Sequence, residues 1–184
     1  IRMASGIEKP TRLNVESRST RNSMGNSGSN WKILVIGGAG ASGKLLSYRL
    51  AWTKFGPSIS IIGKKDTKGS QITQRIIGSS SSESSFNRAP QHEYHTIDIQ
   101  KETEQLREHI RESDIVLHLV APFSSTRIAE ICLEEGVNYV DMSSNSDFTK
   151  NFAEKFNTEA KKKGIVMVSG ASISPALTSC IVDK

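Results

Sequence analysis

Three glycines near the start of the chain are spaced for binding a phosphate group. Gly38, Gly40 and Gly43 fit the pattern G-x-G-x-x-G. In this pattern the first glycine permits a tight turn, the second lets the backbone approach a pyrophosphate, and the third lets a helix pack closely on a strand. The first N–H groups of such a helix lack internal partners, and its dipole favours an anion. The candidate cofactor-binding residues of this segment are Gly38, Ala39, Gly40, Ala41, Ser42 and Gly43.

The residues on both sides of the glycines are those that the motif requires. Ile33–Ile36 is a short apolar run that ends at glycine, which is typical of a buried strand. After Gly43 a helical pattern places Leu45, Leu46 and Leu50 on one side. We therefore predict a strand–turn–helix unit with a nucleotide site at the turn. The alternative is that the glycines form a plain connection.

A phosphate-binding P-loop would use the same residues. Gly38, Gly43 and Lys44 match its pattern, but its last position requires a Ser or Thr whose hydroxyl binds magnesium. The chain has Leu45 there, and a leucine side chain cannot bind a metal ion. The sequence therefore disfavours a nucleoside triphosphatase, and we predict no metal site.

The residues after the second predicted strand bear on the choice between NAD and NADP. In an NAD site an Asp or Glu near this position binds the ribose 2′-hydroxyl. Here Gly63, Lys64 and Lys65 follow the strand, and Asp66 comes next. Lysines would attract a 2′-phosphate, which a carboxylate would repel. We therefore predict NADP(H) in preference to NAD(H), with Lys64 and Lys65 as binding residues; the alternative is that Asp66 reaches the ribose.

The rest of the chain alternates short apolar strands with helical patterns. This alternation predicts an α/β fold, a doubly wound parallel sheet (Rossmann fold) of about six strands. Ser144–Asp147 resembles a capping box that opens a helix ending before Gly164, and Gly136 is expected to end the helix ahead of it. The expected strands are 33–36, 58–62, 93–99, 114–120, 137–142 and 165–168, and the other expected helices are 67–77, 102–112, 124–135 and one that opens at Pro175.

Charge, cysteine content and hydropathy exclude several classes of function. Of the net charge of +5, the first thirty residues contribute most, with five basic residues against two acidic ones, so the basic balance does not indicate nucleic-acid binding. Cys132 and Cys180 lack the spacing of a metal site or a disulfide framework. No apolar run approaches the roughly 18 residues that a membrane span needs.

Three segments are expected along the chain. Residues 1–30 are polar and aperiodic, which predicts a disordered tail. Residues 31–174 form the predicted dinucleotide-binding domain, and residues 175–184 the start of a truncated second domain. We expect a cytoplasmic protein, with organelle targeting by the Ser- and Arg-rich tail as the alternative. The sequence does not decide the oligomeric state, for which a homodimer is one candidate.

Three stretches together resemble the NADP-binding domain of the saccharopine dehydrogenase-like reductases. They are Val35–Gly43, Asp114–Phe123 with its continuation Cys132–Ser143, and Gly164–Leu177. The middle stretch is the most specific, because the glycine motif also occurs in many other families. Two positions depart from the family pattern: Ala121 stands where the family usually has glycine, and Ala176 replaces a frequent glycine after Pro175.

By this resemblance the glycine turn would hold the pyrophosphate, and residues outside the turn would have further roles. Lys64 would meet the 2′-phosphate and Asp98 would sit near the adenine. Ala121 and Pro122 would line the path to the nicotinamide, near Ser143.

The resemblance also implies a function. Members of the family reduce imines or related bonds by hydride transfer, and a second domain, which would follow Pro175, shapes the substrate pocket. We therefore predict the NADP(H)-binding domain of an oxidoreductase that acts on a small molecule, without its substrate domain and with no catalytic residue that can be named. His118, inside a predicted strand, is expected to be a core histidine with a satisfied hydrogen bond. The alternative is a non-catalytic nucleotide-sensing or scaffold protein.

Overall fold

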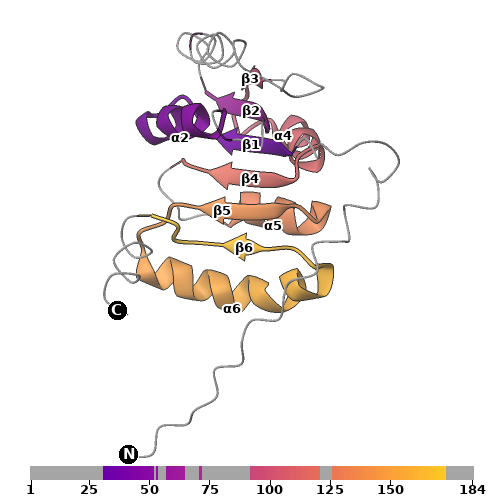
Figure 1. Ribbon diagram of the computed structural model, residues 1–184. Helices are drawn as coiled ribbons and strands as arrows, with labels where there is room; N and C mark the ends of the chain where they lie inside the picture. The colour runs from indigo at the N-terminus through magenta and orange to yellow at the C-terminus, as the bar shows by residue number, and fades with distance from the viewer. Residues whose placement is uncertain are drawn as a thin grey trace, which may run out of the picture.

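A parallel sheet of six strands forms the centre of the computed structural model, which describes residues 31–51, 53, 57–64, 71, 92–120 and 126–172. The strand order is β3-β2-β1-β4-β5-β6, so the chain builds outward from β1 and then crosses back to β4 (Figure 1). This order is that of a doubly wound dinucleotide-binding sheet and confirms the predicted α/β class. The tail 1–30, the helix expected after Pro175 and all but residue 71 of the helix expected over 67–77 lie outside the described residues. The elements are β1 (Lys32–Ile36), α2 (Ala41–Ala51), β2 (Ser58–Gly63), β3 (His92–Thr96), α4 (Thr103–Arg111), β4 (Ile115–His118), α5 (Arg127–Glu135), β5 (Asn138–Asp141), α6 (Ser146–Lys163) and β6 (Met167–Val168).

Several strands are shorter than their apolar patterns predict. β3 ends at Thr96 rather than Ile99, and β4 ends at His118 rather than Val120. Thr96 lies opposite Gly63, the last residue of β2, and β2 is the only neighbour of β3 among the described strands. A strand can extend only as far as a partner strand accompanies it, so apolar character alone overestimates its length.

The helix ends follow from local capping. Gly136 and Gly164 end α5 and α6 with φ values of 67° and 65°, as their positions in the sequence predict. The start of α6 differs from the predicted capping box. Its N-cap is Asn145 rather than Ser144, because the Asn145 side chain accepts a hydrogen bond from the N–H of Phe148 at 3.0 Å.

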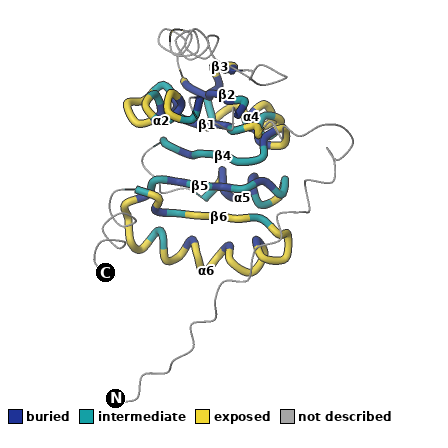
Figure 2. Tube along the Cα trace, in the orientation of Figure 1, coloured by how far each residue is buried: buried dark blue, intermediate teal, exposed yellow. Residues whose placement is uncertain are grey.

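Each face of the sheet has its own apolar core. In β1, Leu34 and Ile36 point into the larger core and Val35 into the smaller one, and all three are fully buried. Helices α4, α5 and α6 cover the larger core, whereas α2 adds Ala51 to the smaller core over β1 and β2. Figure 2 shows buried residues concentrated on the strands and exposed ones on the outer sides of α2 and α6. Burial on both faces explains the continuous apolar runs 33–36 in β1 and 115–117 in β4.

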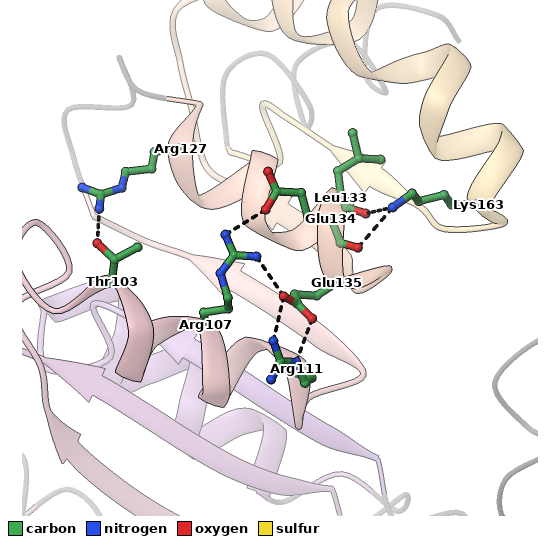
Figure 3. Close-up of polar contacts among 8 residues, drawn as sticks. All are labelled: Thr103, Arg107, Arg111, Arg127, Leu133, Glu134, Glu135 and Lys163. Atoms are coloured by element: carbon green, nitrogen blue, oxygen red, sulfur yellow. Dashed lines mark hydrogen bonds and ion pairs between the residues drawn. The ribbon is translucent and has the colours of Figure 1, made fainter.

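Ion pairs hold α4 and α5 side by side (Figure 3). Arg107 contacts the carboxylates of Glu134 and Glu135, each at 2.8 Å, and Arg111 Nε lies 2.9 Å from Glu135. Hydrogen bonds from Arg111 and Arg107 lower the pKa of Glu135 to about 2. Lys163, the last residue of α6, donates to the backbone carbonyl of Glu134 at 3.1 Å. The helices that cover the larger core are thus joined to one another as well as to the sheet.

Candidate nucleotide-binding site

The turn between β1 and α2 depends on one glycine more than on the others. Gly37 has a φ of 87°, in the left-handed region, and its N–H donates to the carbonyl of Ile62 at 2.8 Å. The carbonyl of Gly37 in turn accepts from the N–H of Gly40 at 3.0 Å. Gly37, rather than Gly38 as the pattern suggests, therefore makes the tight turn possible.

Close packing leaves no room for a side chain at Gly38 or Gly43. A Cβ atom on Gly38 would lie 2.4 Å from Cγ2 of Ile61, so the turn rests directly on β2. A Cβ atom on Gly43 would lie 2.5 Å from both the Gly37 carbonyl oxygen and the Gly38 Cα. Gly43 thus has the helix-packing role that the motif predicts, and any side chain at either position would displace backbone or a core residue.

Gly40 differs from Gly38 and Gly43 because it is exposed and less closely packed. It is exposed, and a Cβ atom there would meet only the Gly37 carbonyl oxygen, at 3.3 Å. Ala41 and Ser42, the first residues of α2, are exposed beside it. The start of α2 is therefore accessible to an anion, as a pyrophosphate site requires.

A pocket lies next to this turn at the carboxyl ends of β1 and β2. Gly63, at the end of β2, approaches so closely that a Cβ atom there would lie 2.2 Å from Oη of Tyr94 and 3.3 Å from Cβ of Ala39. The lining is mostly apolar, with charged groups at Lys64 and Asp98, a combination suited to an adenosine. The lining residues are Ile36, Gly37, Ile62, Gly63, Lys64, Ile97, Asp98, Ile99, Gln100 and Val120.

Lys64 and Asp98 are brought together at the rim of this pocket. Lys64 Nζ lies 3.9 Å from the Asp98 carboxylate, and the Lys64 side chain is 76% exposed. Asp98 is held more firmly, since its Oδ1 accepts from the N–H of Gln100 at 3.1 Å and its own N–H donates to Glu102 at 3.0 Å. A lysine so exposed can turn toward a phosphate, whereas the carboxylate is fixed ahead of α4. The predicted site residues Lys65, Ala121 and Pro122 lie outside the described residues.

Ser143 lies away from that pocket, just beyond the end of β5. It is only 1% exposed, its N–H donates to Asp141 at 2.9 Å, and its Oγ accepts from the N–H of Asn145 at 3.3 Å. Its hydroxyl is therefore engaged in the connection between β5 and α6. The sequence identified Ser143 but missed Asp141, although a carboxylate at the end of an apolar strand is a usable signal for a site.

His118 is a core histidine with a hydrogen bond, as predicted. Its Nδ1 lies 2.9 Å from the hydroxyl oxygen of Tyr139, and it is 5% exposed. Burial lowers the pKa of His118 to about 4, a shift that the nearby charge of Asp141 only partly opposes. Burial also raises the pKa of Tyr139. At neutral pH both side chains are therefore uncharged.

The described residues contain no group of His, Cys, Asp or Glu that could hold a metal ion. Among the helices of the described part of the chain, none is long and apolar enough to cross a membrane.

The family follows from the sequence stretch that spans this sheet. Residues 33–168 match the model of the saccharopine dehydrogenase NADP binding domain. The chain belongs to this family. Its cofactor class is accordingly NADP, and the predicted resemblance is confirmed. No curated protein sequence matches the chain significantly.

Several solved structures share this fold at low sequence identity. Saccharopine dehydrogenase (L-Glu forming) from Saccharomyces cerevisiae is 13% identical, with a TM-score of 0.59, and the match covers 83% of this chain but 29% of that one. A citronellol catabolism dehydrogenase from Pseudomonas aeruginosa is 15% identical, with a TM-score of 0.55, and covers 77% of this chain and 74% of its own. Scyllo-inositol dehydrogenase from Lactobacillus casei, solved with NAD(H), is 11% identical, with a TM-score of 0.53, over 84% of this chain and 41% of that one. At these identities the likeness shows the fold, and this chain spans under a third of the length of the yeast enzyme.

Proposed function

We propose that the chain binds NADPH across the carboxyl ends of its strands and serves as the cofactor-binding part of an oxidoreductase that reduces a small molecule. The observation that carries this proposal is the exposed Gly40 at the start of α2, in a turn whose Gly37 lines the adjacent pocket. When bound there, NADPH would supply the hydride. The chain's own residues would bind and orient the cofactor, and the wall that holds the substrate would come from outside residues 31–174. The chain alone is accordingly expected to catalyse no hydride transfer, because the substrate must be held within roughly 3–3.5 Å of the reacting carbon.

The proposed roles of the site residues follow the path of the cofactor. The turn Gly38–Gly43 would hold the pyrophosphate, and the pocket beside it would take the adenosine near Asp98. Lys64, which is exposed beside that pocket, would meet the 2′-phosphate together with Lys65. The nicotinamide would then lie over the second half of the sheet, near Ala121, Pro122 and Ser143.

The remaining expectations stay part of this proposal. They are a tail over residues 1–30, a nucleotide-binding domain over 31–174 and the start of a second domain at 175–184. The proposal also includes a cytoplasmic location, and a homodimer is its candidate oligomeric state. No observation favours the non-catalytic sensing or scaffold role.

A titration with two cofactors tests the proposal. The fluorescence of Trp31 and Trp52 would be followed while NADPH or NADH is added to the 184-residue chain. We expect saturable binding of NADPH that is about tenfold tighter than that of NADH, a difference of ~1.4 kcal/mol. Equal affinities, or a preference for NADH, would refute the assignment of Lys64 and Lys65 to the 2′-phosphate. If neither NADPH nor NADH binds, the proposed site is refuted.

A further inference from the structure

The carboxylate of Asp141 joins two connections at the end of the sheet. Asp141 is the last residue of β5 and is fully buried. Its Oδ1 accepts three hydrogen bonds, from the N–H of Ser143 at 2.9 Å, the hydroxyl of Ser169 at 2.9 Å and the N–H of Gly170 at 3.0 Å. Ser143 follows β5, whereas Ser169 and Gly170 follow β6. One side chain therefore sets the relative position of two backbone segments.

Backbone contacts at the same place strengthen this junction. The carbonyl of Asp141 accepts from the N–H of Ala171 at 2.8 Å, and the hydroxyl of Ser172 donates to the carbonyl of Ser143 at 3.4 Å. Gly170 has a φ of 86°, a conformation that lets the chain turn back toward the carboxylate. The segment 169–172 is thus attached to the end of β5 at several points.

The second carboxylate oxygen faces the interior of the sheet. Asp141 Oδ2 accepts from the hydroxyl of Tyr139 at 3.2 Å, and the Tyr139 oxygen can then accept from Nδ1–H of His118 at 2.9 Å. The donors that surround the carboxylate are neutral groups. An apolar residue in its place would leave the N–H groups of Ser143 and Gly170 and the hydroxyl of Ser169 without this acceptor, so the carboxylate is what holds the two connections together.

The two connections lie where the second half of a dinucleotide would reach. A sheet in this order consists of two mononucleotide-binding halves, with the pyrophosphate at the first turn between them. The pocket with Lys64 and Asp98 belongs to the half formed by β1, β2 and β3. The carboxyl ends of β5 and β6 belong to the other half, which would take the nicotinamide nucleotide.

We propose that Asp141 is a positioning residue for the nicotinamide half of the site. It would fix Ser143 and the segment 169–171 as a preformed wall, without itself touching the cofactor. This inference rests on the proposed NADPH site and specifies which residue organises its second half. A wall that is fixed in advance lowers the ordering cost of binding, so loss of the carboxylate should weaken binding of the nicotinamide portion.

The test compares two ligands that share the adenosine end. NADPH carries the nicotinamide, and adenosine 2′,5′-bisphosphate lacks it. In the 184-residue chain with Asp141→Ala, we expect the Kd for NADPH to rise about tenfold, because the two connections would then have to be ordered when the nicotinamide portion binds. The Kd for adenosine 2′,5′-bisphosphate should stay within about twofold, because the pocket in the first half is untouched.

Tyr139→Phe is the matched control. It leaves Oδ2 of Asp141 and Nδ1 of His118 without this partner and so destabilises the same core, but it keeps the three hydrogen bonds to Oδ1. We expect both Kd values to stay within about twofold in this variant. The inference is wrong if Tyr139→Phe weakens NADPH binding as much as Asp141→Ala does. It is also wrong if Asp141→Ala raises the Kd values of both ligands equally, or raises neither.

A milder variant covers the case in which Asp141→Ala does not fold. Ser169→Ala removes one of the three donors to Oδ1, and it should raise the Kd for NADPH about threefold and leave that for adenosine 2′,5′-bisphosphate unchanged. If Ser169→Ala changes the two Kd values equally or not at all, the positioning role is overturned. If the unchanged chain binds neither ligand, the NADPH proposal itself fails and this inference falls with it.

Discussion

The two halves of the sheet prepare for a ligand in opposite ways. The half built from β1, β2 and β3 presents an exposed Gly40 and a Lys64 side chain that is 76% exposed. In the half built from β4, β5 and β6, the described strand ends hold a buried carboxylate, Asp141. A phosphate can be attracted by a solvated charge, whereas an aromatic ring needs a surface that is already in place. The comparison suggests that the first half supplies charge recognition and the second supplies shape.

The largest expected effect separates the open glycine from the packed ones. Gly40→Val should abolish detectable NADPH binding, a loss of about a hundredfold or more, because the side chain would occupy the approach of the pyrophosphate to the backbone. The fold should survive, since a Cβ atom at Gly40 meets only one backbone oxygen at 3.3 Å. Fluorescence titration and circular dichroism would measure the two properties.

Gly43→Ala is the contrasting variant, because its Cβ would lie 2.5 Å from backbone atoms of the turn. It should lower the midpoint of thermal unfolding. Normal NADPH binding by a folded Gly40→Val protein would show that the nucleotide site lies elsewhere.

His118, at the end of β4, should make the stability of the fold sensitive to acid. The pKa of His118 is about 4 in the folded chain, below its ordinary value of 6.5. As the pH falls below 6.5 the unfolded chain takes up this proton first, so the free energy of unfolding decreases down to about pH 4, by roughly 3 kcal/mol in total. His118→Asn removes this titration. The unfolding free energy of this variant should therefore fall less between pH 6.5 and pH 4 than that of the unchanged chain.

Urea unfolding at several pH values between 7 and 4 would measure this difference. His92 and His109 also have lowered pKa values, chiefly from burial, but they are present in both proteins, so the difference between the two curves isolates His118. Parallel curves for the two proteins would contradict the assignment.

A charge change at Lys64 sharpens the first half of the comparison. Lys64→Ala should weaken NADPH binding about tenfold, or ~1.4 kcal/mol, and leave NADH binding unchanged, because only NADPH carries the 2′-phosphate. The matched control is Lys101→Ala, an exposed lysine just before α4 that the proposal does not place on the cofactor. Isothermal titration with both cofactors would measure the effect, and an equal loss for NADH would point to a structural role for Lys64 instead.

The smallest expected effect concerns the connection after β5. Asn145→Ala should lower the free energy of unfolding by about 1 kcal/mol, because it removes the side-chain oxygen that caps α6 at 3.0 Å from the N–H of Phe148. Ser144→Ala, one residue earlier, should have almost no effect. Chemical denaturation of both variants would measure the difference, and a larger loss for Ser144→Ala would restore the capping box that the sequence suggests.

Local patterns in the sequence were sufficient to predict the elements and the turn. The apolar run that ends at Gly37 located β1, and Gly136 and Gly164 marked the ends of α5 and α6 correctly, because helix caps and glycine turns depend on residues only a few positions apart. Strand ends were less accurate, as β3 shows, because the length of a strand depends on its neighbour. The left-handed residue of the turn is Gly37 rather than Gly38 for a related reason, because the hydrogen bond from the Gly37 N–H to the Ile62 carbonyl attaches the turn to the neighbouring strand β2.

The sequence by itself thus determined the class of fold, the position of the glycine turn and the family to which the chain belongs. Only the tertiary structure decided how the second half of the site is held together. Ser169 and Gly170 lie 28 and 29 residues beyond Asp141, and they reach its carboxylate because β6 pairs beside β5. No periodicity or motif encodes that contact, because it exists only after the sheet has brought two distant strand ends to the same edge.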